Sequence, residues 1–151
     1  MAALFFDTSA LVRRYDDTEP GAARVQALCD PAAGNLILIS RIASVEMASA
    51  LNSKLRSGTI DVFRRNERWT VFLSHRHRQY RNQPLDVATL AEAEQLTFRH
   101  SLRAYDAVHL STALQVALIM QETVGDFRFC TADRRQAGAA TAEGLEVELI
   151  E

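Results

Sequence analysis

The feature that most constrains the fold is the alternation of short apolar runs with longer segments of helical character. Runs typical of strands buried on both faces occupy residues 4–6, 36–39 and 127–130, and an alternating run at 145–150 resembles an edge strand. Helical patterns lie between these runs. Strands that alternate with helices favour a parallel sheet with right-handed crossovers, so we expect an α/β fold.

The helices are expected where apolar positions recur with helical spacing. The predicted segments are a short helix ending near residue 15, followed by 22–29, 42–51, 59–80, 88–98, 104–120 and 133–142. The inward side of the 88–98 helix is expected to carry Leu90, Ala93, Leu96 and Thr97. The polar segment 82–84, which includes Pro84, is expected to break the pattern.

Size and composition indicate one domain, residues 1–151, because 48% hydrophobic residues can build a core in a chain of this length. The net charge of -2 gives no overall basic signature for nucleic-acid binding. Cys29 and Cys130 lack metal-type spacing and are expected to be buried free thiols in a reducing compartment. No run approaches the ~20 apolar residues of a membrane span, so we expect no membrane association and a cytoplasmic location.

Three apolar segments, 4–12, 42–51 and 104–120, each contain one carboxylate and no Lys or Arg. An ionised carboxylate among buried groups is costly unless it is paired, hydrogen-bonded or bound to a metal. A single hard divalent cation could serve all three of these acids, because such ions prefer oxygen ligands. The acids are Asp7, Glu46 and Asp106, and Asp133 is the expected fourth member.

Structural roles are alternatives for each acid. Asp7 and Asp133 could be helix N-caps, and Asp106 could interact with the helix dipole. Glu46 is expected well inside its helix, where neither role explains it. An ion pair with an arginine is the alternative for Glu46, and the candidate partners are Arg13, Arg103 and Arg134.

Four segments of the chain resemble the four acidic motifs of the PIN-domain nucleases, especially the bacterial VapC toxins. They are Phe6-Asp7-Thr8-Ser9-Ala10-Leu11-Val12, Ser44-Val45-Glu46, Leu102-Arg103-Ala104-Tyr105-Asp106-Ala107-Val108-His109-Leu110 and Cys130-Thr131-Ala132-Asp133. Each motif alone is weak, but four in order across essentially the whole chain are specific. The resemblance implies a three-layer α/β/α PIN-like fold with a central parallel sheet of about five strands.

The same resemblance implies an endoribonuclease that depends on Mg²⁺, with Mn²⁺ as a substitute. It implies that Asp7, Glu46, Asp106 and Asp133 are both catalytic residues and metal ligands, with Ser9 and Thr131 as hydroxyl residues near the metal. It further implies that the protein is the toxin of a toxin–antitoxin pair, neutralised by a VapB-type antitoxin, and that it forms a homodimer.

Basic residues near the acids are the expected contacts to RNA phosphates. These residues are Arg13, Arg14, Arg103, Arg134 and Arg135. His109 shares a helical face with Asp106 and is expected to pack in the core. The arginines between Arg64 and Arg81 are expected to form a solvated helix face, with an RNA contact or an acidic antitoxin segment as the alternative.

Two other functions are alternatives for this sequence. A haloacid-dehalogenase-like phosphatase also places an Asp after its first strand, but it needs a second acid two residues later, where this chain has Ser9. A PIN-like interaction module without catalysis is the non-enzymatic alternative. Loss of RNA cleavage in EDTA separates a nuclease from such a module.

Overall fold

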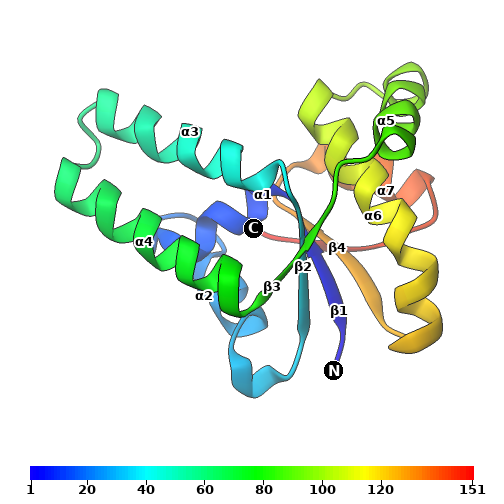
Figure 1. Ribbon diagram of the computed structural model, residues 1–151, viewed down its shortest axis with the longest axis horizontal. Coiled ribbons are helices and arrows are strands. Elements are labelled where there is room, and N and C mark those ends of the chain that lie inside the picture. The colour runs from blue at the N-terminus through cyan, green and yellow to red at the C-terminus, as the bar shows by residue number, and fades with distance from the viewer.

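The computed structural model describes residues 1–151 and contains one five-stranded parallel sheet in the order β3-β2-β1-β4-β5 (Figure 1). The strands are β1 (Ala3–Phe6), β2 (Leu36–Ser40), β3 (Tyr80–Gln83), β4 (Phe127–Thr131) and β5 (Glu146–Leu149). The predicted parallel sheet of about five strands is confirmed.

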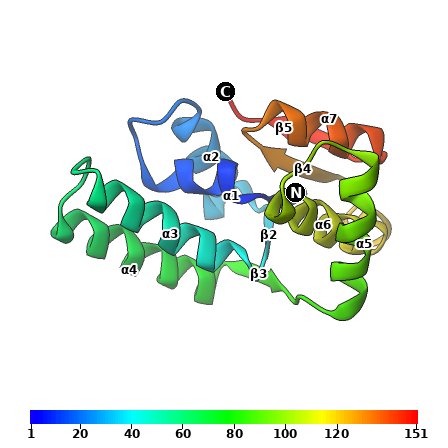
Figure 2. The same ribbon diagram turned by 90° about the horizontal axis from the view of Figure 1, so that it is seen from above.

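Helices cover both faces of this sheet and complete three layers (Figures 1 and 2). The helices are α1 (Thr8–Leu11), α2 (Ala22–Leu28), α3 (Ala43–Arg56), α4 (Val62–Arg78), α5 (Val87–Arg99), α6 (Ala104–Thr123) and α7 (Arg134–Ala142), with short 3₁₀ segments η1 (Val12–Tyr15) and η2 (Pro31–Ala33). The core on one side of the sheet includes residues of α1 to α4, and the core on the other side includes residues of α5 to α7. The α/β/α prediction is therefore correct.

Strand β1 is central, and its two faces contribute to two separate cores. Leu4 and Phe6 belong to the core beneath α1 to α4, whereas Ala3 and Phe5 belong to the core beneath α5 to α7. All four side chains are fully buried. A strand buried on both faces has no polar positions, and this explains the continuous apolar run at the start of the chain.

Helices α3 and α4 form a hairpin that extends away from the sheet (Figures 1 and 2). The fully buried ring of Phe72 anchors α4 to the core. Asp16, which follows η1, forms ion pairs with Lys54 of α3 at 2.5 Å and with Arg68 of α4 at 3.2 Å. This buried carboxylate thus ties both helices of the hairpin to the loop after η1.

Two local predictions were wrong. The expected 59–80 helix is shorter, since α4 ends at Arg78 and Tyr80 begins the edge strand β3. In α5, Leu90 and Thr97 are exposed, although Ala93 and Leu96 are buried as expected. The apolar face of α5 is therefore narrower than its sequence suggests.

Cys29 and Cys130 are buried free thiols, as predicted. Burial raises the pKa of Cys29 to about 11, so its thiol is protonated at neutral pH. None of the helices has both the length and the apolar character that crossing a lipid bilayer requires.

Candidate active site

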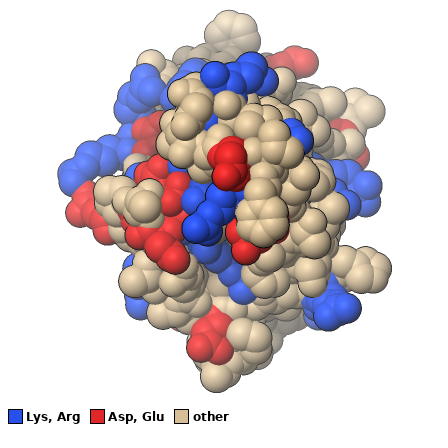
Figure 3. Space-filling view, turned by 90° about the vertical axis from the view of Figure 1, so that its left-hand side faces the viewer, with Lys and Arg blue, Asp and Glu red and all other residues tan.

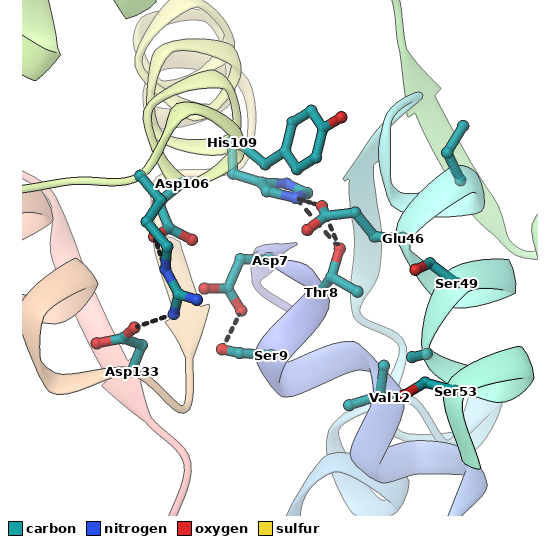
Figure 4. Close-up of a pocket in the computed structure, with 14 residues that line it drawn as sticks. Asp7, Thr8, Ser9, Val12, Glu46, Ser49, Ser53, Asp106, His109 and Asp133 are labelled. Atoms are coloured by element: carbon teal, nitrogen blue, oxygen red, sulfur yellow. Dashed lines mark hydrogen bonds and ion pairs between the residues drawn. The ribbon is translucent and has the colours of Figure 1, made fainter. Parts of the chain in front are cut away.

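The four predicted acids line one pocket of about 580 Å³. Asp7 and Asp133 closely follow the ends of β1 and β4, Glu46 lies in the first turn of α3, and Asp106 lies in the first turn of α6. Parallel strands end at the same edge of a sheet, which brings these distant segments together. Figure 4 shows the side chains facing a common space.

Asp7 is the most buried of the four acids, with 3% of its surface exposed. Its Oδ1 accepts hydrogen bonds from the backbone N–H of Ala10 at 3.0 Å and from Ser9 Oγ at 2.7 Å. Its Oδ2 accepts a hydrogen bond from Thr131 Oγ1 at 2.5 Å. Asp7 is therefore both the N-cap of α1 and a pocket residue, so the two interpretations are compatible.

Burial raises the pKa of Asp7 above its ordinary value, although nearby His109 and the hydrogen bonds from Thr131, Ala10 and Ser9 oppose the rise. The carboxylate form thus carries a desolvation cost in the folded protein. A cation bound beside Asp7 would offset that cost.

Glu46 is held by two hydrogen-bond donors that share one of its oxygens. Thr8 Oγ1 donates to Glu46 Oε1 at 2.9 Å, and His109 Nε2 donates to the same oxygen. Burial acts to raise the pKa of Glu46, but the hydrogen bond and charge of His109 and the bond from Thr8 outweigh it, so the pKa is lowered. The carboxylate is therefore ionised at neutral pH, with Oε2 facing no donor.

Two sequence-based expectations about this pair need correction. Glu46 lies in the first turn of α3, where the helix dipole favours a carboxylate. Its ion-pair partner is His109 rather than Arg13, Arg103 or Arg134. His109 is buried as predicted, but it is also part of the site. A lone His in a nearly uncharged helix was the only sequence signal for this contact.

Asp106 and Asp133 share a cationic neighbour, Arg103. Arg103 Nε lies 3.6 Å from Asp106 Oδ2, and another guanidinium nitrogen lies 3.9 Å from Asp133 Oδ2. Asp133 is also the N-cap of α7, because its Oδ1 accepts from the backbone N–H of Arg135 at 2.8 Å. The Arg103 side chain is 76% exposed, so these ion pairs are weak tethers.

Hydroxyl groups connect the two strand ends that carry Asp7 and Asp133. Ser9 Oγ lies 3.2 Å from Thr131 Oγ1 and accepts from the backbone N–H of Ala132 at 2.9 Å. Thr131 Oγ1 also accepts from the backbone N–H of Asp133 at 3.1 Å. Ser9 and Thr131 therefore lie beside Asp7 and Asp133, and the role near a metal that the resemblance implies for them stays a prediction.

Gln136 is a further residue that the sequence did not single out. Its side chain is fully buried, and its Nε2 donates to the backbone oxygen of Asp106 at 2.9 Å. This contact fixes the first turn of α7 against the first turn of α6. The spacing between Asp106 and Asp133 is thereby constrained.

A family model described as "PIN domain" matches residues 4–141. The matched range spans most of the chain and contains all four pocket acids. The chain belongs to the PIN-domain family. A comparison with curated protein sequences finds no match.

Solved structures share the PIN fold at low sequence identity. A Rickettsia felis VapBC2 complex bound to a promoter DNA fragment matches with 13% identity and a TM-score of 0.65, covering 99% of both chains. A DNA-bound VapBC from Salmonella typhimurium matches with 12% identity and a TM-score of 0.64, covering 100% of both. Mycobacterium tuberculosis VapC20, described as a sarcin-ricin loop cleaving toxin, matches with 15% identity and a TM-score of 0.62, covering 90% of this chain and 94% of that one.

Of the arginines expected to contact RNA, only Arg103 lines the pocket of this PIN domain. Arg14 is bonded to Gln79 Oε1 and to the Tyr80 hydroxyl, both at 2.7 Å, so its guanidinium has a structural role. Arg13 donates to the backbone oxygen of Pro20, and Arg134 pairs with Glu151. Arg135 lies 3.9 Å from Asp133 at the edge of the site.

The arginine-rich helix α4 does not produce a uniformly basic face. Figure 3 shows Lys and Arg side chains interspersed with Asp and Glu on the side of the molecule where the α3–α4 hairpin projects. Arg64 pairs with Glu67, and Arg68 pairs with Asp16. The exposed Arg64–Glu67 pair agrees with the expected solvated helix face, whereas the Arg68 side chain is only 18% exposed and pairs with a buried carboxylate.

The donor chemistry of the pocket fits a hard divalent cation, since its ionisable ligands are carboxylates. Glu46 Oε2 and Asp106 Oδ1 accept no hydrogen bond within the protein, and Asp133 Oδ2 has only the distant Arg103 contact. As the side chains lie, no three His, Cys, Asp or Glu residues are close enough together to hold an ion. Binding would therefore require side-chain rotation toward the centre of the pocket.

Proposed function

We propose that this PIN domain is a divalent-metal-dependent endoribonuclease and the toxin of a VapBC-type toxin–antitoxin pair. The observation that carries the proposal is the gathering of Asp7, Glu46, Asp106 and Asp133 in one pocket, although they come from four separate segments. Four carboxylates so placed repel one another, and the exposed guanidinium of Arg103 offsets that repulsion only weakly, so a bound cation would be stabilised among them. Mg²⁺, or Mn²⁺ in its place, is the cation that we infer.

Family membership and the described activities of structural neighbours support this proposal. VapC20 is described as cleaving the sarcin-ricin loop, and two other neighbours are VapBC complexes. Cleavage of an RNA phosphodiester is the corresponding reaction for this chain. The choice of RNA depends on surface features outside the four acids.

A bound divalent ion would supply Lewis acidity and would lower the pKa of an attacking water. In this chain, Glu46, Asp106 and Asp133 would hold the ion through the oxygens that have no close donor. Asp7 would contribute a carboxylate that Ser9, Ala10 and Thr131 hold in one orientation. Once an ion neutralised Asp106 and Asp133, the guanidinium of Arg103 would be free to leave these two acids and contact the RNA phosphate.

The inferred macromolecular partner is a VapB-type antitoxin. The pocket is open and acidic, so a basic antitoxin side chain could occupy it and exclude both RNA and the ion. A homodimer, expected from the family resemblance, stays a prediction that size-exclusion chromatography with light scattering can test.

The proposal is tested by incubating the purified protein with transfer, ribosomal and messenger RNA in Mg²⁺ or Mn²⁺. We expect cleavage at defined positions, loss of cleavage in EDTA and recovery on adding excess Mg²⁺. Asp106→Asn should abolish cleavage while the circular dichroism spectrum stays that of the wild type. Expression of the wild-type protein without an antitoxin should arrest the growth of the bacterial host, whereas expression of Asp106→Asn should not.

Glu122→Gln is the matched control, because Glu122 is an exposed acid of the same helix. It lies sixteen residues beyond Asp106, which is about 24 Å along α6. We expect wild-type cleavage from this variant. Cleavage that persists in EDTA, or in a folded Asp106→Asn protein, would contradict the metal-dependent mechanism, and cleavage of no RNA at all would favour a non-catalytic module.

A further inference from the structure

The pocket has two chemically different halves. Asp7, Asp106 and Asp133 lie on one side, and Val12, Ser49 and Ser53 lie on the other, with Glu46 between them (Figure 4). Val45 and Ala50 complete the second half, which contains no Lys or Arg. A volume of about 580 Å³ also exceeds what one hydrated ion needs, so there is room for part of a substrate.

Tyr105 contributes an aromatic ring to the lining of this pocket. It is 54% exposed, makes no side-chain hydrogen bond and pairs with no other aromatic ring. Tyr105 precedes Asp106 and lies one helical turn before His109, on the same face of α6. Because His109 bonds to Glu46, the ring of Tyr105 lies toward the Glu46 side of the acids.

The chemistry of this half selects the nucleoside part of a nucleotide. A phosphate placed there would meet the carboxylate of Glu46 and no Lys or Arg. A nucleobase is uncharged and stacks on aromatic rings, and this is a common way of binding single-stranded RNA. The hydroxyls of Ser49 and Ser53, which have no bond within the protein, could donate to a base edge or a ribose 2′-hydroxyl.

We propose that Tyr105 is a stacking platform for an unpaired base of the nucleotide next to the scissile phosphate. This inference rests on the proposed ribonuclease function and deepens it, because it requires a single-stranded or loop substrate. A base inside a duplex has no free face for the ring to cover.

The test compares Tyr105→Ala and Tyr105→Phe on a short fluorescent single-stranded RNA that carries the mapped cleavage site. Binding is measured by anisotropy in Ca²⁺, and cleavage is measured in Mg²⁺. Stacking contributes about 1–3 kcal/mol per base, so we expect Tyr105→Ala to raise Kd and KM about 5- to 150-fold. Tyr105→Phe should stay within about twofold of the wild type, since it keeps the ring.

A substrate with an abasic ribonucleotide beside the cleavage site makes the test specific. The base is removed on one side or the other of the cleavage site. On one of these two sides, its removal should weaken RNA binding by the wild type as much as the Tyr105→Ala substitution does. The same removal should have no further effect on the Ala variant. Equal thermal unfolding midpoints of the three proteins would exclude misfolding, as expected for an exposed side chain.

Unchanged Kd and KM in Tyr105→Ala would overturn the proposed stacking role. The same conclusion would follow if the substitution and the abasic substrate lowered RNA affinity independently, so that their effects added. A Tyr105→Ala protein that loses only its affinity for a co-expressed antitoxin would also overturn it, because the ring would then serve a protein partner. These results differ from failure of the proposed function, in which the wild type cleaves no RNA.

Discussion

His109 on α6 donates a hydrogen bond from Nε2 to Oε1 of Glu46 on α3, across the pocket. The His109 side chain is 2% exposed, so this bond forms inside the protein. Thr8 bonds to the same oxygen. Two donors on Oε1 leave Oε2 as the natural contact for a cation, which makes His109 a positioning residue for Glu46.

His109→Leu removes this donor and leaves Glu46 with Thr8 alone. Loss of a hydrogen bond that orients a metal ligand typically lowers metal affinity about 10- to 100-fold. We expect that range for Mn²⁺, measured by isothermal titration calorimetry. His100→Leu is the control, because His100 pairs with Glu143 and does not line the pocket. Equal Mn²⁺ affinity in the two variants would remove the positioning role.

Arg103→Gln should have opposite effects on metal and RNA. Its charge lies 3.6 Å from Asp106 and 3.9 Å from Asp133, and a unit charge about 4 Å away contributes ~1 kcal/mol in water. We therefore expect Mn²⁺ to bind about fivefold more tightly to the variant. For RNA, the logarithm of the association constant falls with the logarithm of the salt concentration. The magnitude of that slope should decrease by about one in the variant.

The exposed Arg99 provides the control for Arg103. It pairs with Glu92 and Glu143, neither of which lines the pocket. Arg99→Gln should change neither Mn²⁺ affinity nor the salt dependence of RNA binding. A shift of the same size in both variants would mean that overall charge, and not the place of Arg103, is responsible.

Asp7→Asn should stabilise the metal-free protein at neutral pH. Burial raises the pKa of Asp7 in the folded state, so the carboxylate form destabilises the fold once the pH exceeds the unfolded value near 4. Asn keeps the N-cap and removes the charge. At low pH the variant and the wild type should have the same thermal unfolding midpoint. The midpoint of the variant should then exceed that of the wild type by a growing amount as the pH rises through the elevated pKa. An unchanged difference at every pH would refute this account.

Asp16→Asn should loosen the α3–α4 hairpin. Burial alone would raise the pKa of Asp16, but hydrogen bonds from Lys54 and Thr18 outweigh it and lower the pKa. The stabilisation is therefore present above pH ~4 and is lost as the pH falls through the lowered folded value. We expect a loss of about 2 kcal/mol in the free energy of unfolding at pH 7, measured in urea.

Asp17→Asn is the neighbouring control for Asp16, because Asp17 is exposed and its carboxylate bonds only to the exposed Gln26. It should change the free energy of unfolding by less than about 0.5 kcal/mol. An equal loss in the two variants would show that Asp16 has no special role in holding the hairpin.

The sequence predicts the three central strands and the alternating edge strand β5, but it misses the other edge strand, β3. The apolar runs at β1, β2 and β4 reflect burial on both faces. Strand β3 consists of Tyr80-Arg81-Asn82-Gln83, and only Tyr80 is buried. Its polar composition resembles the end of a helix and a loop, so periodicity could not identify it.

The site was predictable from composition for three acids, Asp7, Glu46 and Asp106, because each stands in a segment without Lys or Arg, whereas Asp133 is followed by two arginines. Asp7, Glu46, Asp106 and Asp133 do line one pocket. The contacts of His109, Arg14 and Gln136 were not predictable, because they depend on which helices meet in three dimensions. Spacing along one helix carries no information about a partner on another helix.

The most direct test of the account is the anomalous diffraction of a crystal soaked in Mn²⁺. We predict a peak in the pocket about 2.0–2.2 Å from oxygens of at least three of the four acids, with the Arg103 guanidinium displaced from Asp106 and Asp133. A saturated crystal with no peak there, or with manganese bound only elsewhere, would contradict the claim that these carboxylates hold the ion.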